Sequence, residues 1–191
     1  GAAYDYPPGE TEPDAALYVQ DDLTINGEGA LRVTAHINHG IVAKDALVIE
    51  GGVLSVTAAN VGIRGRDSLT VSGGDITVAS QGDALQANNP GGRSTGFISL
   101  TGGNFHLTAG KDGIQAETSL TISGGSYTLV AGGGSGALDL SEEATTGKGL
   151  KAGLDLHISG GAFDLDCADD ALHANGSVTI QGGGQAGLVY N

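Results

Sequence analysis

The chain has 191 residues, of which 35 are glycine, and it contains no tryptophan and no methionine. Its 22 acidic residues against 8 basic ones give a formal net charge of −14, which repels phosphate backbones and argues against nucleic acid as a partner. The shortage of large side chains argues against a layered globular fold, whose interior such side chains normally fill.

No apolar run reaches the roughly 20 residues that a membrane-spanning helix needs, so no membrane insertion is expected. Residues 1–16 include three prolines and are expected to form an N-terminal arm or linker. Residues 17–191 show no break in composition and are expected to form one domain.

An internal repeat follows the arm, with residues 17–35 as its first unit. An apolar residue preceded by Gly or Ala returns at Ile41, Ile63, Leu85, Ile114, Leu150 and Leu172. Three of the five intervals are 22 residues long, and the other two contain the insertions Pro90–Gly96 and Gly132–Thr146. A fixed period of this length indicates a solenoid.

Each repeat also carries a pair of glycines, which suits a corner because glycine adopts positive φ without a steric penalty. These pairs begin at Gly51, Gly73, Gly102, Gly124, Gly160 and Gly182. Between corners apolar residues alternate, which is the period of half-buried strands. Such short strands bury their apolar face only by stacking on the next repeat. The sequence therefore predicts an all-β, right-handed parallel β-helix of about seven 22-residue coils with two loop insertions.

Stacking at this period predicts inward columns of side chains. One column holds the six apolar residues that define the repeat, and the next holds Leu54, Ile76, Phe105, Tyr127 and Phe163. The lone cysteine, Cys167, falls in a column of small residues with Ala58, Ser80, Ala109 and Ala131. We expect it to be a packed, unreactive thiol.

The residue two positions before the first column is acidic in several repeats. The positions are His39, Val61, Asp83, Asp112, Lys148 and Asp170. Because stacked strands lie about 4.8 Å apart and calcium lies roughly 2.4 Å from its ligands, one ion can bridge Asp83 and Asp112. Further oxygen donors stand beside this pair at Gln86, Gln115, Asn88 and Glu117.

A second acidic cluster contains Asp169 and Asp170, followed by His173 and Asn175 on the same repeat. It is a second candidate calcium site, although Asp and Asn are also common turn residues at corners.

Four of the eight basic residues flank the acidic pair, Arg64 and Arg66 one repeat before Asp83 and Lys148 and Lys151 one repeat after Asp112. They either neutralise the carboxylates or bind the carboxylates of a uronate polymer. The candidate ligand-binding residues are Arg64, Arg66, Lys148, Lys151 and His173.

Three motifs, KDGIQA at 111–116, KGLKA at 148–152 and ADDALHAN at 168–175, resemble a family of secreted bacterial carbohydrate-binding domains with a pectate-lyase-like right-handed parallel β-helix. The resemblance implies bound calcium, an extracellular or cell-surface location, and cellulose or polygalacturonate as ligands. By position it implies Asp83, Asp112, Asp169 and Asp170 as candidate calcium ligands.

Three functions stay open on these grounds. The first is calcium-dependent, non-catalytic binding of an acidic polysaccharide, with further domains of a longer parent chain as other partners. The second is a polysaccharide lyase with Lys148 or Lys151 as base, although acidic neighbours favour the charged form of a lysine and make it a poor base. The third is a surface adhesin or structural spacer.

Overall fold

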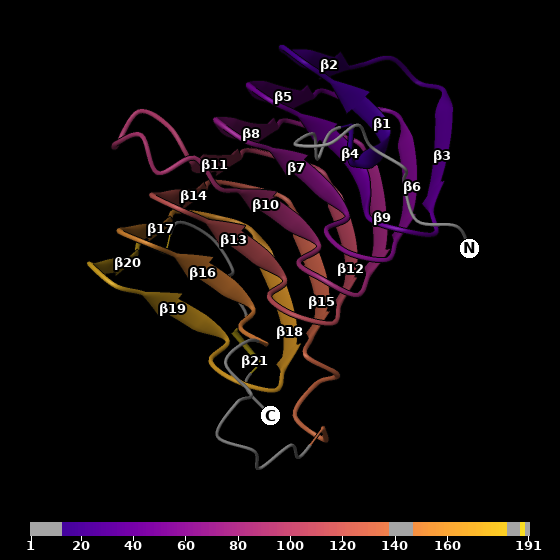
Figure 1. Ribbon diagram of the computed structural model, residues 1–191. Coiled ribbons are helices and arrows are strands. Elements are labelled where there is room, and N and C mark those ends of the chain that lie inside the picture. Colours follow the sequence, from indigo (N-terminus) through magenta and orange to yellow (C-terminus); the bar gives the residue numbers. More distant parts are fainter. Residues whose placement is uncertain (1–12, 138–146, 183–187, 190–191) are drawn as a thin grey trace.

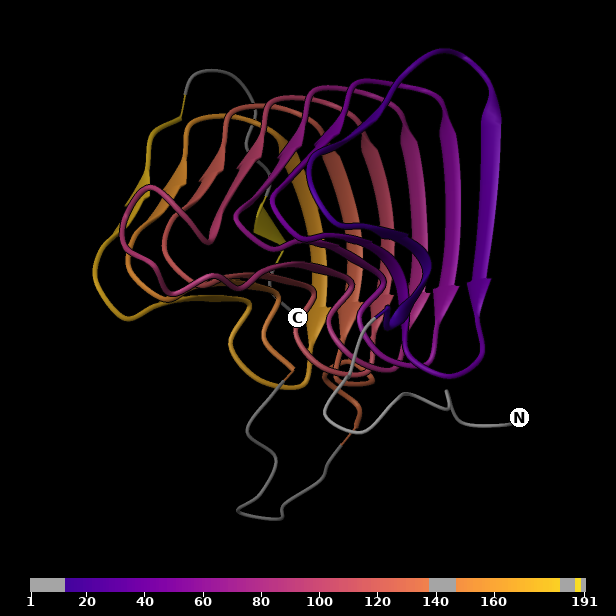
Figure 2. The same cartoon turned by 45° about the horizontal axis from the view of Figure 1, so that its top comes forward.

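The computed structural model describes residues 13–137, 147–182 and 188–189, and these residues form three parallel sheets of seven strands each (Figure 1). Each coil contributes one strand to every sheet, and the coils stack along one axis (Figures 1 and 2). The predicted right-handed parallel β-helix of seven coils is confirmed. Among the described residues no helix is long and apolar enough to cross a membrane.

Sheet A contains β1 (Ala15–Val19), β4 (His39–Ala43), β7 (Ile63–Gly65), β10 (Leu85–Ala87), β13 (Ile114–Ala116), β16 (Leu150–Ala152) and β19 (Leu172–Ala174). Sheet B contains β2 (Leu23–Ile25), β5 (Ala46–Ile49), β8 (Ser68–Val71), β11 (Phe97–Leu100), β14 (Leu120–Ile122), β17 (Leu156–Ile158) and β20 (Val178–Ile180). Sheet C contains β3 (Ala30–Ala35), β6 (Val53–Ala58), β9 (Asp75–Ser80), β12 (Asn104–Ala109), β15 (Ser126–Ala131), β18 (Ala162–Cys167) and β21 (Leu188–Val189).

The two insertions enter at different points of the coil. Pro90–Gly96 lies between β10 and β11, and the longer insertion lies between β15 and β16. Residues 138–146 of the longer insertion lie outside the described residues, as do residues 1–12 of the predicted arm. The first described strand begins at Ala15, two residues before the predicted start of the domain.

The glycine pairs form the corner between sheets B and C. The second glycine of each pair has φ between 86° and 107° at Gly52, Gly74, Gly103, Gly125 and Gly161. This left-handed region favours glycine because a Cβ would meet the following carbonyl oxygen.

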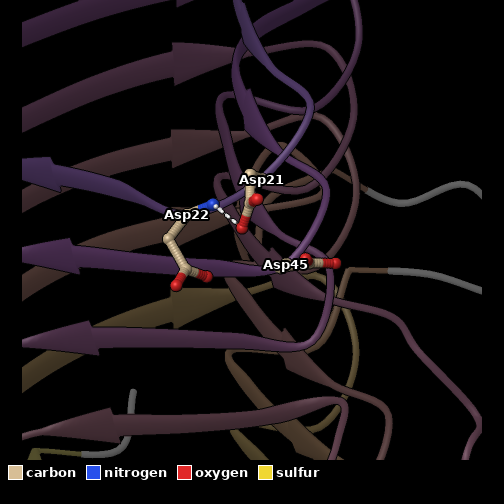
Figure 3. A group of neighbouring side chains, drawn as sticks. All are labelled: Asp21, Asp22 and Asp45. Carbon is tan, nitrogen blue, oxygen red and sulfur yellow. Dashed lines mark hydrogen bonds between the residues drawn. The ribbon is translucent and has the colours of Figure 1, made fainter.

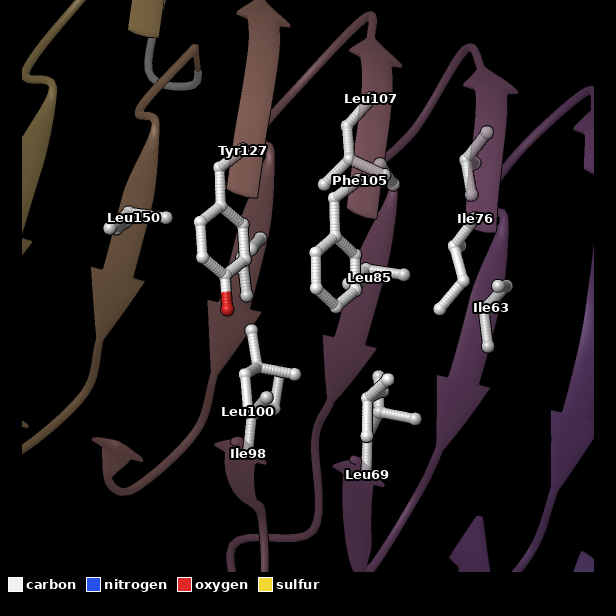
Figure 4. Close-up of a cluster of buried hydrophobic side chains, with 14 of the residues drawn as sticks. Ile63, Leu69, Ile76, Leu85, Ile98, Leu100, Phe105, Leu107, Tyr127 and Leu150 are labelled. Carbon is white, nitrogen blue, oxygen red and sulfur yellow. The ribbon is translucent and has the colours of Figure 1, made fainter. Parts of the chain in front are cut away.

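The predicted columns fill the interior. Ile41, Ile63, Leu85, Ile114 and Leu150 are in register and fully buried, whereas Leu172 of the last coil is partly exposed. The rings of Phe105, Tyr127 and Phe163 stack with centroids 4.7 and 4.8 Å apart. Figure 4 shows the first two of these rings beside the aliphatic column.

Two polar side chains of these inward columns, Tyr127 and Cys167, are packed without disturbing the interior. The hydroxyl of Tyr127 donates to the carbonyl of Gly124 at 2.8 Å. Cys167 lies in register with Ala131, and burial, with the charge of Asp166, raises its pKa to about 11. A thiol with a raised pKa is a weak nucleophile at neutral pH, in line with the predicted packing role.

Close packing makes the glycine before the first column sensitive to substitution. In Gly62→Ala the new Cβ would contact Val78 and lie 2.7 Å from the carbonyl oxygen of Ala84. We expect a loss of about 1–3 kcal/mol in the free energy of unfolding, measured by urea denaturation. Gly29→Ala is the control, because nothing lies within 4 Å of its added Cβ. Equal stability of the two variants would contradict this account of the interior.

Candidate functional site

One outward-facing line of side chains on sheet A is polar over five successive coils. The register places Arg64 beside Gln86, Gln86 beside Gln115, Gln115 beside Lys151, and Lys151 beside His173. All five side chains are partly exposed. We call this line, Arg64, Gln86, Gln115, Lys151 and His173, the polar row. At about 4.8 Å per strand it is roughly 19 Å long.

The polar row contains three of the five predicted ligand-binding residues, Arg64, Lys151 and His173. Lys148 precedes β16 and lies next to the row. Arg66 follows β7, is exposed, and is not part of the row. The row begins at Arg64, since Val42, its neighbour in the register, is fully buried.

At the start of the sheet A strands, beside the polar row, side chains of one coil accept hydrogen bonds from the backbone of the next coil. The Nδ1 atom of His39 accepts from the amide of Val61 at 3.2 Å. Asp83 Oδ1 accepts from the amide of Asp112 at 3.1 Å. Asp112 Oδ1 in turn accepts from the amides of Gly147 and Lys148, both at 3.0 Å. The predicted acidic pair therefore joins coils through hydrogen bonds.

The second oxygen of each carboxylate is also engaged. Asp83 Oδ2 accepts from Gln86 Nε2 at 2.6 Å, and the same amide donates to Gln115 Oε1 at 2.9 Å. Asp112 Oδ2 lies 2.7 Å from Lys151 Nζ. Asp83 is 7% exposed and Asp112 is 1% exposed. Burial, followed by the charge of Asp112, raises the pKa of Asp83.

These contacts test whether Asp83 and Asp112 suit the expected calcium ion. Calcium takes six to eight oxygen ligands at roughly 2.3–2.6 Å. Here every oxygen of the two carboxylates already accepts a hydrogen bond, and a lysine ammonium supplies the positive charge. The arrangement of the described residues does not fit calcium at this pair. The predicted donors Asn88 and Glu117 follow β10 and β13, at the opposite end of these strands from Asp83 and Asp112, and Asn88 has a buried amide oxygen without a partner.

The second predicted cluster lies at the far end of the polar row, in the corner between β18 and β19. Lys148 Nζ pairs with Asp169 Oδ2 and lies 3.8 Å from Asp170 Oδ2. His173 Nδ1 lies 2.9 Å from Asp170 Oδ2, and its Nε2 lies 3.2 Å from the Asn175 amide oxygen. The side chains of Asp169 and Asp170 are 37% and 51% exposed. These carboxylates are thus accessible, unlike the buried pair.

The corner also sets the charge state of Lys148. Burial alone would lower the pKa of Lys148, but the hydrogen bond and charge of Asp169, with the charges of Asp170 and Asp112, raise it overall. The hydrogen bond from Lys148 is the main cause that lowers the pKa of Asp169. Lys148 therefore carries its proton at neutral pH.

At the other end of the row, Arg64 is held by a residue that the sequence analysis did not single out. Asp14 Oδ2 lies 3.3 Å from both Arg64 Nη2 and His39 Nε2. Burial, and then the charge of Arg64, lowers the pKa of His39 to about 4. Asp14 lies outside the repeat and 50 residues before Arg64, so no pattern in the sequence pointed to it.

A third acidic group, Asp21, Asp22 and Asp45, lies at the end of sheet A in the first two coils (Figure 3). One carboxylate oxygen of each lies within 4.8 Å of the others, and all three residues are exposed. Asp21 and Asp45 are as far apart in the sequence as Leu23 and Leu47, which pair in the structure. This spacing was the signal that could have revealed the group.

Comparison with known proteins gives three matches. A family model described as carbohydrate-binding domain-containing protein matches residues 1–186. A carbohydrate-binding domain-containing protein of Acetivibrio thermocellus is 43% identical over 51 residues, which are 27% of this chain and 18% of that protein. The polysaccharide lyase-like protein from C. thermocellum, solved as a gadolinium derivative, has a TM-score of 0.62 and 26% identity. That match covers 94% of this chain and 58% of the solved chain. This chain therefore spans only part of the length of both relatives.

The raised pKa of the buried Asp83 carboxylate predicts how the stability of the protein depends on pH. Its folded-state pKa is raised above the unfolded value of about 3.9. Its contribution to stability is therefore fully present below that unfolded value and is lost as pH rises through the folded pKa. Asp83→Asn keeps an oxygen for the Asp112 amide and removes the buried charge.

We expect the stability of Asp83→Asn relative to the wild type to increase between pH 4 and pH 7, measured by urea denaturation. Asp164→Asn, at an exposed position on sheet C, controls for the change in net charge. A stability difference between Asp83→Asn and wild type that stays constant over this range would contradict the assignment.

Proposed function

The chain belongs to the family of carbohydrate-binding domain-containing proteins, and we propose that it binds an acidic, polygalacturonate-like polysaccharide along the polar row without cleaving it. The observation that carries the proposal is the register of the five polar side chains on sheet A. An extended polymer can contact successive coils in the same way, because each coil presents one side chain at the same height.

The chemistry of the row suits an anionic polymer. Arg64, Lys151 and His173 supply donors for carboxylates, and the amides of Gln86 and Gln115 suit hydroxyl groups. Neutral cellulose is a weaker candidate, since sugar faces pack on exposed aromatic rings and the five side chains of the polar row include no aromatic ring other than the imidazole of His173. A polymer of this kind also supports an extracellular or cell-surface location.

The same geometry argues against a lyase. A general base needs a pKa near the working pH, and the pKa of Lys148 is raised. Lys151 forms an ion pair with Asp112 at 2.7 Å. The likeness to a polysaccharide lyase-like protein keeps lyase activity as an outcome of the test below.

Calcium enters the proposal at Asp169 and Asp170, whose carboxylates are exposed and where the ion would displace Lys148 Nζ from Asp169. Calcium is a hard cation that prefers oxygen ligands, and these side chains together with a polymer carboxylate supply several.

The test measures binding to polygalacturonate and to its methyl-esterified form by calorimetry, with calcium and with chelator. We expect the uncharged ester to bind at least about tenfold more weakly, the equivalent of about 1.4 kcal/mol. Lys151→Gln should weaken binding of polygalacturonate to a similar extent, because it removes a charge-assisted hydrogen bond. Lys111→Gln is the matched control, since Lys111 is exposed and lies outside the row.

Ultraviolet absorbance of unsaturated uronide is followed in the same samples. Binding without growth of absorbance supports the proposal, and growth would establish the lyase instead. Equal affinity for the acid and the ester, or an equal effect of the two lysine substitutions, would overturn it. Binding that survives the chelator unchanged would remove calcium from the proposal and leave the polar row.

The contact between Asp14 and Arg64 leads to a separate prediction about the affinity for polygalacturonate. Its carboxylate contacts the Arg64 guanidinium, which is the group that a polymer carboxylate would contact. Asp14→Asn removes the competing charge, so we expect polygalacturonate to bind several-fold more tightly. Asp155→Asn is the control, because Asp155 pairs with Arg93 away from the row. Unchanged or weaker binding by Asp14→Asn would show that Asp14 does not compete.

A further inference from the structure

Two carboxylates in neighbouring coils, Asp83 and Asp112, lie close enough for one to accept from the backbone amide of the other at 3.1 Å. Both are buried, so water does little to screen their repulsion. Such a pair needs a compensating positive charge. In proteins that charge comes either from a metal ion or from a basic side chain.

The described residues supply this charge from the next coil. Lys151 lies on β16, and its ammonium group reaches back to Asp112 Oδ2 at 2.7 Å. Asp83 is the more distant carboxylate and takes the amide of Gln86 instead. The hydrogen bonds that remain for Asp112 come from the backbone amides of Gly147 and Lys148.

We infer that the Lys151 ammonium replaces a calcium ion between the coils of Asp83 and Asp112, so that this part of the solenoid is held together without metal. The ammonium contacts only one of the two carboxylates, that of Asp112. Calcium would need several oxygens turned toward it, whereas the ammonium needs one carboxylate oxygen and leaves the others to the backbone. This inference does not rest on polymer binding.

It follows that removal of the ammonium creates a calcium site. In Lys151→Ala two buried carboxylates face the space that the ammonium vacates. The other ammonium that acts on Asp112, that of Lys148, is paired with Asp169. Carboxylates without a paired cation favour binding of a hard cation. Gln86 and Gln115 can add amide oxygens by rotation of their side chains. Lys111→Ala, which removes one exposed positive charge from the residue before Asp112, is the matched control.

The experiment counts calcium ions by calorimetry at constant ionic strength, with magnesium in parallel, and records Tm with calcium and with chelator. We expect Lys151→Ala to bind one more calcium ion than the wild type and to recover several degrees of its lost Tm with calcium but not with magnesium. Lys111→Ala should bind the same number of ions as the wild type.

A second arm keeps the inference testable if Lys151→Ala folds poorly. Asp83→Asn in the otherwise wild-type chain should leave the number of bound calcium ions unchanged, because no ion uses this pair. Loss of one ion in Asp83→Asn would overturn the inference, since the pair would then bind calcium beside Lys151. A folded Lys151→Ala variant that gains no calcium would overturn it as well.

Discussion

Parallel hydrogen bonding between successive coils is the constraint on which the rest of the molecule depends. It aligns each position of the repeat with the same position one coil later, as the register of Gln86 with Gln115 and of Gln115 with Lys151 shows. Inward positions must then be apolar in every coil, and outward positions form continuous lines. The same repeat in the sequence thus produces both the apolar core and the polar row.

The same alignment creates an electrostatic problem on sheet A. Acidic side chains that recur at one position meet across the spacing of two strands, about 4.8 Å. The molecule resolves this with backbone amides and with lysines, Lys151 for Asp112 and Lys148 for Asp169. Because the chain has a net charge of −14, the cations gathered here make sheet A the face on which an anionic polymer meets the least repulsion.

Much of the fold was predictable because a repeat determines register. The columns of Ile41 and Leu54, the small-residue column of Cys167 and the glycine corners all follow from positions 22 residues apart. The repeat does not determine which atoms a side chain contacts. It therefore predicted that Asp83 and Asp112 are neighbours, but not that their oxygens accept from amides and from Lys151.

Contacts outside the repeat were not predictable in this way. Asp14 lies before the first strand, so its contact with Arg64 depends on the path of the chain onto sheet A. Asp21, Asp22 and Asp45 belong to the first two coils, where paired positions on sheets A and B are 24 residues apart instead of 22, which obscures the repeated position. Sequence patterns identified the face that carries the site, and the structure was needed for its chemistry.

The most direct test of the central claim is a crystal structure of the protein with a short oligogalacturonate. The account predicts that the sugar chain lies along sheet A, with its carboxylates against Arg64, Lys151 and His173. A chain bound across the outer face of sheet C, with the polar row empty, would contradict it.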